Sequence, residues 1–212
     1  MKLRTLVLCD DAWHPAEVVQ RGLNALADSR FAFEFITHGG DWSAAVMEEF
    51  PLVVVAKANH RCATDQASWL TAENEMAFPE FVQRGGGLLV LHGGTTGYKT
   101  LLHMRQSLGG VFLTHPDQCP VTVEPKSGHP MTVGVKRFTE QDEHYFMAMD
   151  DAQADVFMHT RSEHGVQPAG WTRTEGNGRV CVLTPGHNVA VWLNLEFQKL
   201  LRNGLQWLAK IN

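Results

Sequence analysis

Short apolar runs alternate with helical patterns through the first half of the chain, and this alternation restricts the fold more than any other feature. The runs are LRTLVLCDD at 3–11, FAFEFITH at 31–38, PLVVVAK at 51–57 and LLVL at 88–91. Continuous aliphatic runs are typical of strands that are buried on both faces of a parallel sheet. Strands that alternate with helices imply right-handed crossovers. We therefore predict an α/β fold with a mostly parallel sheet and helices on both of its faces.

Residue spacing predicts the main helices. Pro15 is well placed at a helix start, and the apolar residues after it recur with helical spacing as far as Leu26. Thr64 and Asp65 give an N-cap signal for a long helix that reaches Val82, with a kink or split at Pro79. The segment 195–210 predicts an amphipathic helix whose inward residues are Phe197, Leu200, Leu201, Leu205 and Leu208.

The second half is less regular. Segments at 119–125, 153–160, 167–174 and 178–186 resemble strands, and we expect several of them to be antiparallel, at a sheet edge or in a small excursion. The sequence contains no internal repeat and no linker, which favours a single domain over residues 1–212.

Charge and composition restrict the partners. The formal net charge is −5 and no stripe of Lys and Arg is present, which argues against a nucleic-acid partner. No apolar stretch has the length of a membrane helix, and the N-terminal apolar run is too short for a signal peptide. The four cysteines are far apart and indicate no disulfide framework. We expect a cytoplasmic protein with a small-molecule ligand.

Two histidines stand at the ends of buried runs. His92 follows LLVL and precedes Gly93 and Gly94, while His187 ends RVCVLTPGH. Ligands of open parallel sheets bind at the carboxyl ends of the strands, so we predict a functional role for both histidines. Neither GxGxxG nor a phosphate-binding lysine motif is present, and no nucleotide cofactor is expected.

Further candidates share the chemistry of these two histidines. They are His14 after the first run, His115 in a His-Pro dipeptide, and the acidic pair Asp142–Glu143. Histidine and carboxylate together serve both metal binding and proton transfer near neutral pH. No fixed ligand spacing such as HExxH is present, so both chemistries stay open. Trp13 and Trp192 stand beside strand-end histidines, where they either stack on a sugar ring or pack in the core or rim.

Five motifs in order carry a resemblance to a known family. They are FVQRGGGLLVLHGGT, LGGVFLTHP, GHPMTVGVKRFTEQDEHY, AGWTRTEGNGRVCVLTPGHN and FQKLLRNGLQWLA. In this order they resemble ThuA-like proteins, the family named for trehalose utilisation. The family is similar in fold to class I glutamine amidotransferases, so the resemblance implies a flavodoxin-like three-layer α/β/α sandwich. Amidotransferases carry a catalytic cysteine at the elbow after a strand, and a late histidine followed by glutamate. Here the elbow position resembles His92 and the late position His187, followed by Asn188, so glutaminase activity is not expected.

The resemblance implies an enzyme that acts on trehalose or a related disaccharide, with an oxidised keto form included. In one mechanism a divalent metal, most plausibly zinc, is held by some of His14, His92, His115 and His187, with Glu143 as a ligand or general base. In the other, His92 and His187 act as an acid/base pair and Asp142 orients one ring. Gly93, Gly94, Trp13 and Trp192 are the expected substrate contacts. Hydrolysis, elimination and isomerisation stay open, as does a homo-oligomer. The alternative is a non-catalytic module that binds a sugar or sugar phosphate.

Overall fold

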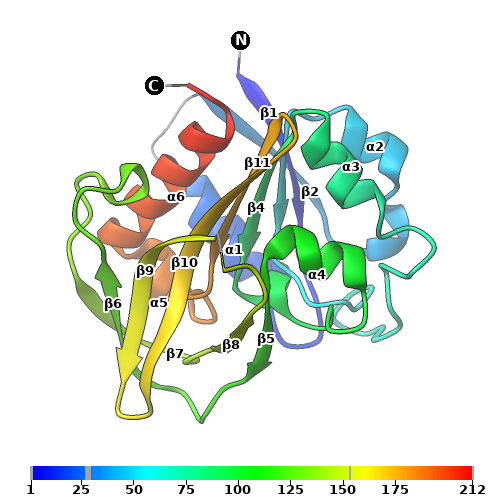
Figure 1. Cartoon of the computed structure of the whole chain (residues 1–212). Helices are drawn as coiled ribbons and strands as arrows, with labels where there is room; N and C mark the ends of the chain where they lie inside the picture. Colours follow the sequence, from blue (N-terminus) through cyan, green and yellow to red (C-terminus); the bar gives the residue numbers. More distant parts are fainter. Residues whose placement is uncertain (1, 27–29, 153, 212) are drawn as a thin grey trace.

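A nine-stranded sheet crosses the middle of the protein in the computed structural model, which describes residues 2–26, 30–152 and 154–211. The strand order is β2-β1-β3-β4-β11-β10-β9-β6-β7 (Figure 1). Its first five strands are mutually parallel, and the remainder are antiparallel. The parallel strands are β1 (Leu3–Leu8), β2 (Phe31–Ile36), β3 (Leu52–Val55), β4 (Gly87–Leu91) and β11 (Gly178–Leu183).

The parallel half has the flavodoxin order. Numbered along the chain, its strands run 2-1-3-4-5, and the order reverses between β1 and β3. Every residue of β3 and β4 is buried, as expected for central strands with helices on both sides. The predicted mixed α/β fold with a flavodoxin-like sheet is confirmed. The carboxyl ends of these strands form the edge at which a ligand of this fold binds.

Helices cover both faces of the sheet (Figure 1). On one face lie α1 (Ala16–Asn24), α5 (Val189–Leu193) and α6 (Leu195–Leu208). On the other lie α2 (Ala44–Glu48), α3 (Ala77–Gln83) and α4 (Leu102–Leu108). Successive residues of β1 point to opposite layers: Val7 packs with the first group of helices, and Leu6 and Leu8 pack with the second. The inward residues predicted for 195–210 are buried on α6.

The antiparallel half extends the sheet beyond β11. It consists of β10 (Gly165–Glu175), β9 (Asp155–Ser162), β6 (Cys119–Pro125) and β7 (Phe138–Asp142). A separate two-stranded ribbon joins β5 (Gly110–Thr114) to β8 (Phe146–Met149). The short 3-10 turns are η1 (Gly39–Asp41), η2 (His92–Thr95) and η3 (Pro130–Thr132). The strands predicted at the edge are found there, except that β11 is parallel to β4 in the sheet interior. Gln153, predicted at a strand start, lies outside the described residues.

The long helix predicted from Thr64 to Val82 is wrong. Residues 64–76 form turns, bends and an isolated bridge at Asp65, and only α3 is helical. The Asn59 side chain bonds the backbone N–H and carbonyl of Leu70, and the Trp69 indole N–H donates to the Ala58 carbonyl. These hydrogen bonds stabilise the loop conformation of the segment. Pro79 is the third residue of α3, where a missing N–H costs no helical hydrogen bond, so it lies in the first turn without a kink.

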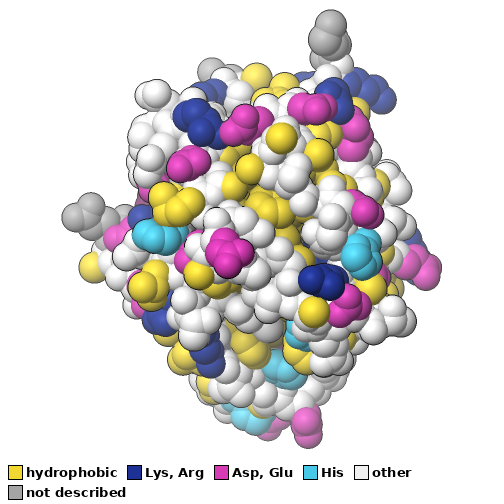
Figure 2. Space-filling model, turned by 90° about the vertical axis from the view of Figure 1, so that its right-hand side faces the viewer, with side chains coloured by type: hydrophobic (Ala, Val, Ile, Leu, Met, Phe, Trp, Pro, Cys, Tyr) yellow, Lys and Arg dark blue, Asp and Glu magenta, His cyan; other side chains and the backbone are white. Residues whose placement is uncertain are grey.

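No helix among the described residues is long and apolar enough to cross a membrane. On the face that carries α2, α3 and α4, basic and acidic side chains are interspersed and no patch of one sign dominates (Figure 2).

Candidate metal and substrate site

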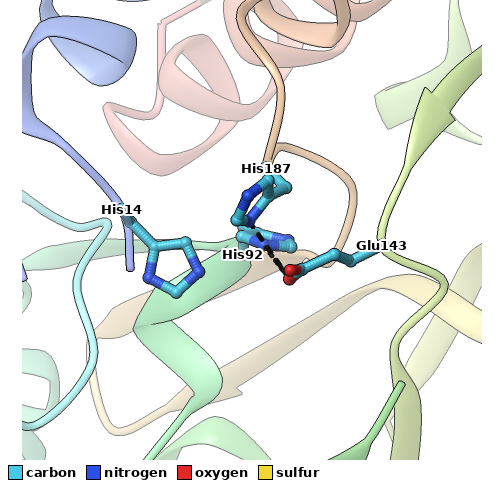
Figure 3. A group of neighbouring side chains, drawn as sticks. All are labelled: His14, His92, Glu143 and His187. Atoms are coloured by element: carbon cyan, nitrogen blue, oxygen red, sulfur yellow. Dashed lines mark ion pairs between the residues drawn. The ribbon is translucent and has the colours of Figure 1, made fainter. Parts of the chain in front are cut away.

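Four side chains converge at the carboxyl edge of the parallel strands. His14 follows β1, His92 follows β4, His187 follows β11, and Glu143 comes directly after β7 from the antiparallel half (Figure 3). One nitrogen of each imidazole and one oxygen of the carboxylate all lie within 4.8 Å of one another. Three predicted histidines and one predicted carboxylate are therefore brought together, although 173 positions separate the first from the last in the chain. This group could hold a metal ion.

His92 occupies a strained turn between β4 and η2. Its φ is +42°, in the left-handed region that a residue with a Cβ seldom adopts. The ring Nδ1 lies 2.8 Å from the carbonyl oxygen of Thr184. A carbonyl only accepts, so Nδ1 carries the proton, and Nε2 of the neutral ring presents a lone pair to the site. Strain of this kind is found at functional sites.

Asp11 fixes His14, and sequence reasoning missed it as a functional residue. Its two carboxylate oxygens lie 3.0 and 2.8 Å from His14 Nδ1. The same carboxylate accepts the backbone N–H groups of Trp13, His14 and Ala58. Burial lowers the pKa of His14, helped by the nearby His92, while the Asp11 hydrogen bond opposes this. His14 is thus held as a neutral ring whose Nε2 faces the group. The only sequence signal was an acidic pair at the end of the first run.

Gly93 and Gly94 make room for this packing. A Cβ on Gly93 would lie 2.6 Å from His14 Nδ1, and one on Gly94 would lie 2.1 Å from the Val55 carbonyl oxygen. Both glycines are buried. Because neither glycine has a Cβ, His14 and β3 can lie close to the turn after β4.

Glu143 is the centre of the group. Its Oε2 lies 3.3 Å from His92 Nε2 and 3.1 Å from His187 Nδ1. Burial raises the pKa of Glu143, but the hydrogen bonds and charges of His187 and His92 outweigh it and hold the pKa well below its usual range. The same hydrogen bond raises the pKa of His187 against the effect of burial. Glu143 is therefore an anion in the neutral pH range.

Asp142 lies behind the group and does not line it. It is 1% exposed, and its two oxygens accept the backbone N–H groups of Gly186 and His187, each at 2.9 Å. Burial raises its pKa, opposed by His92 and by these backbone bonds. Asp142 fixes the loop that carries His187, which makes it a positioning residue. Neither imidazole of the pair predicted to be oriented by Asp142 bonds to it among the described contacts.

A cavity of about 500 Å³ opens onto the group. Trp13, Thr96, Phe112, His115 and Tyr145 line it together with His14, Glu143 and His187. Trp13 is 52% exposed and its ring lies 4.5 Å from that of His60, so about half of the side chain is open to solvent at the rim of the cavity. Trp192, the other predicted sugar contact, is 1% exposed and lies in the core against Phe197. Its indole N–H donates to the Gly186 carbonyl, so Trp192 stabilises the loop that carries His187.

Residues 7–208 match the ThuA family, described as trehalose utilisation. The chain belongs to the ThuA family. A search of curated proteins gave no match. The family predicted from the five motifs is confirmed.

Solved structures agree with the ThuA fold. The chain is similar to a ThuA-like protein from Parabacteroides merdae ATCC 43184, with a TM-score of 0.78 and 18% identity over 99% of this chain and 90% of that one. For a ThuA-like protein from Bacteroides uniformis ATCC 8492 the TM-score is 0.73 and the identity is 17%, over 97% of this chain and 91% of that one. For a beta-galactosidase from Rahnella sp. R3 the TM-score is 0.68 and the identity is 12%. That match covers 100% of this chain and only 32% of the beta-galactosidase. At these identities the likeness shows the fold alone.

Tyr145 is a second residue of this ThuA-family site that sequence reasoning missed. Its ring stacks on His92 at 4.0 Å between centroids, and its hydroxyl lies 3.3 Å from His14 Nε2. Burial raises the pKa of Tyr145 well above its usual value, so the phenol keeps its proton. It stands two residues after Glu143 in DEHY, and that proximity was the available signal.

His115 lines the cavity but stands apart from the other three histidines. Its Nε2 lies 3.6 Å from Glu143 Oε1, whereas the closest Glu143 oxygen to His92 and to His187 is Oε2. It is not among the four residues whose ligand atoms converge. The structure therefore brings together three of the four histidines predicted as metal ligands.

The donor set of the ThuA-family site fits a divalent transition metal. His92 Nε2 and His187 Nδ1 are buried, and apart from their contacts with Glu143 neither atom has a hydrogen-bond partner among the described residues. His92 and His14 each have the remote ring nitrogen bonded to an oxygen, as metal-binding imidazoles do. Three imidazoles and one carboxylate match the ligands of Zn²⁺ and its neighbours in the first transition row.

Proposed function

We propose that this ThuA-family protein is an enzyme that processes an uncharged disaccharide, trehalose or a related sugar, with the His14–His92–His187–Glu143 group as a zinc site. The proposal rests on one observation, that a ring nitrogen of His92 and an oxygen of Glu143 lie opposite each other. His92 Nδ1 donates to the Thr184 carbonyl, which leaves Nε2 of a neutral ring without a proton, and Nε2 lies 3.3 Å from an oxygen of the Glu143 carboxylate. Two acceptors at that distance need a proton or a cation between them.

A bound zinc ion would supply Lewis acidity toward a sugar carbonyl or a water molecule. The chain itself supplies the remaining functions. Glu143 holds negative charge at the floor of the cavity, and Tyr145 holds a proton on its hydroxyl. Trp13 offers an aromatic face on which the apolar side of a pyranose stacks.

The lining supports an uncharged substrate. Neither lysine nor arginine is among the described residues that line the cavity, and its one carboxylate is an anion. A phosphate group would find there neither of the two side chains, lysine and arginine, that most often bind one. This disfavours the alternative of a module that binds sugar phosphates. The density of titratable groups also favours chemistry over binding, because a neutral sugar is held mainly by hydrogen-bonding and aromatic side chains.

Elemental analysis of the purified, untagged protein tests the proposal. We expect near-stoichiometric zinc in the wild type and a large loss in His92→Gln and His187→Gln. His159→Gln, which removes an exposed histidine of β9, is the control and should keep its zinc. No metal in the wild type, even after incubation with excess Zn²⁺ or Mn²⁺, would rule out the metal site and leave the His92–His187 acid/base pair.

Turnover assays follow on the zinc-loaded protein. Trehalose and trehalose oxidised to a ketone at one ring hydroxyl are the first substrates, with trehalose 6-phosphate as the charged comparison. We expect turnover of at least one neutral sugar and its loss in His92→Gln. Binding of all three sugars without turnover would favour the non-catalytic module.

A further inference from the structure

We infer that His115 and Glu143 Oε1 together bind two neighbouring hydroxyl groups of the sugar ring, and that His115 is not a metal ligand. This inference rests on the proposed function and specifies how the substrate is recognised. It assigns the two oxygens of Glu143 to different partners. Oε2 faces His92 and His187, and Oε1 faces His115.

The position of His115 separates it from the metal group. It follows the end of β5, in the ribbon of β5 and β8, whereas His14, His92 and His187 follow strands of the parallel sheet. The His115 side chain is 35% exposed and that of His92 is 2% exposed. His115 therefore lies where an entering ligand meets the protein, and His92 lies at the base.

The tautomer of His115 defines what its Nε2 can bind. Its Nδ1 lies 2.8 Å from the carbonyl oxygen of Pro116, which only accepts, so in the neutral ring the proton is on Nδ1. Nε2 is then an acceptor, and the atom opposite it is the carboxylate oxygen Oε1 of Glu143 at 3.6 Å. At that distance the two atoms form no hydrogen bond with each other.

Two acceptors side by side match two donors side by side. A hydroxyl group has one hydrogen to donate, so one hydroxyl satisfies one of the two atoms. A vicinal diol satisfies both, with one hydroxyl on His115 Nε2 and its neighbour on Glu143 Oε1. Sugar rings carry such diols, and an uncharged diol brings no second anion to Glu143. The pair therefore selects rings by two adjacent hydroxyl groups.

Aromatic neighbours hold the His115 ring in place without a metal. It stacks on Tyr145 with 5.8 Å between centroids and an interplanar angle of 23°, and it lies 5.8 Å from the Phe112 ring. Tyr145 stacks in turn on His92. The imidazole thus belongs to an aromatic wall, and a phenylalanine at position 115 would preserve that wall while removing both nitrogens.

The test measures zinc and sugar binding in the same variants. His115→Phe keeps the ring stack, and His115→Gln restores an acceptor. Zinc content comes from elemental analysis, and the Kd for trehalose and its keto derivative comes from calorimetry on zinc-loaded protein. We expect wild-type zinc content in both variants, a Kd raised about tenfold in His115→Phe, equivalent to about 1.4 kcal/mol, and partial recovery in His115→Gln. For glucose analogues that lack one hydroxyl, the Kd for the wild type should rise by about the same factor when the missing hydroxyl belongs to the recognised diol.

The outcomes separate this inference from the proposed function. Zinc loss in His115→Phe comparable with that in His92→Gln would make His115 a ligand and overturn the inference, while the zinc enzyme stands. An unchanged Kd in His115→Phe would also overturn it. A wild-type protein without zinc would remove the metal chemistry, and the same Kd comparison made on the metal-free proteins would then decide the inference. A wild-type protein that holds zinc but binds neither sugar would overturn both the substrate class and the inference.

Discussion

Asp11 and His14 form a buried pair in which Nδ1 of the imidazole lies 2.8 and 3.0 Å from the two oxygens of the carboxylate. The pair sits directly after β1, where the strand order of the sheet reverses. Because the same carboxylate binds the backbone of Ala58 after β3, it joins the carboxyl ends of two neighbouring strands. The orientation of His14 is thus set by the sheet itself.

Asp11→Asn should weaken metal binding and stability together. An amide has one acceptor oxygen, so its NH₂ group would face N–H donors that now bind a carboxylate. We expect zinc affinity to fall by about 10- to 100-fold, as for other partners of metal-binding histidines. The free energy of unfolding should fall by about 1–3 kcal/mol. Competition with a chelator and chemical denaturation measure these. Glu73→Gln, at an exposed acidic position, is the control and should change neither.

Gly93→Ala and Gly94→Ala should have different effects although the residues are adjacent. The new Cβ of Gly93→Ala meets the His14 ring, a side chain that can shift at the cost of its hydrogen bond with Asp11, whereas that of Gly94→Ala meets the backbone carbonyl of Val55 inside the sheet. We expect Gly93→Ala to lose zinc with most of its stability kept. Gly94→Ala should lower the melting temperature more. Equal zinc affinity in Gly93→Ala and the wild type would contradict the packing described for His14.

The stability of the metal-free protein should depend on pH through Glu143 and His187. Glu143 raises the pKa of His187 above 6.5, so this contribution is complete below 6.5 and is lost as pH rises through the folded-state pKa. His187 and His92 outweigh burial and hold the pKa of Glu143 below 4.5, so that contribution is present above 4.5 and is lost as pH falls toward the folded-state pKa. The stabilisation is therefore greatest between these two values.

Comparison with Glu143→Gln in the presence of chelator isolates this effect. The difference in unfolding free energy between the two proteins should peak between pH 4.5 and 6.5 and shrink at higher pH. Denaturant titrations at a series of pH values measure it. A difference that stays constant from acid to alkaline pH would show that the ion pair contributes nothing.

Substitution of Trp13 should affect mainly sugar binding, and substitution of Trp192 should affect mainly stability. Trp13 is 52% exposed, so Trp13→Ala should change the free energy of unfolding by less than about 0.5 kcal/mol and weaken sugar binding. Trp192 is 1% exposed, so Trp192→Ala should cost about 3–5 kcal/mol. Thermal unfolding and calorimetry with trehalose test both. Sugar affinity that is unchanged in Trp13→Ala would remove the stacking platform from the proposed site.

The sequence by itself determined the first four parallel strands, the positions of β11 and of most outer strands, and the last helix. Their signals are local, because a buried strand such as β4 needs only its own apolar residues and α6 only its own spacing. The glycines after His92 likewise marked a sharp turn within a few residues. The strand-end histidines were found for the same reason. Local patterns report burial and the order of strands and helices along the chain, and from these His14, His92 and His187 were expected at strand ends.

Only the tertiary structure decided which of those residues meet. The strand order 2-1-3-4-5 brings His14 beside His92, and the path of the chain after β7 brings Glu143 to them, from segments with no local relation. Asp11 binds the backbone of Ala58, 47 positions away, and Tyr145 contacts His14, 131 positions away. Trp192 looked like Trp13 in sequence but lies in the core. Residues 64–82 carry a helix-start signal, yet Trp69 and Leu70 are buried in a loop. In each case the free energy of long-range packing exceeded the local preference, and a local pattern does not record it.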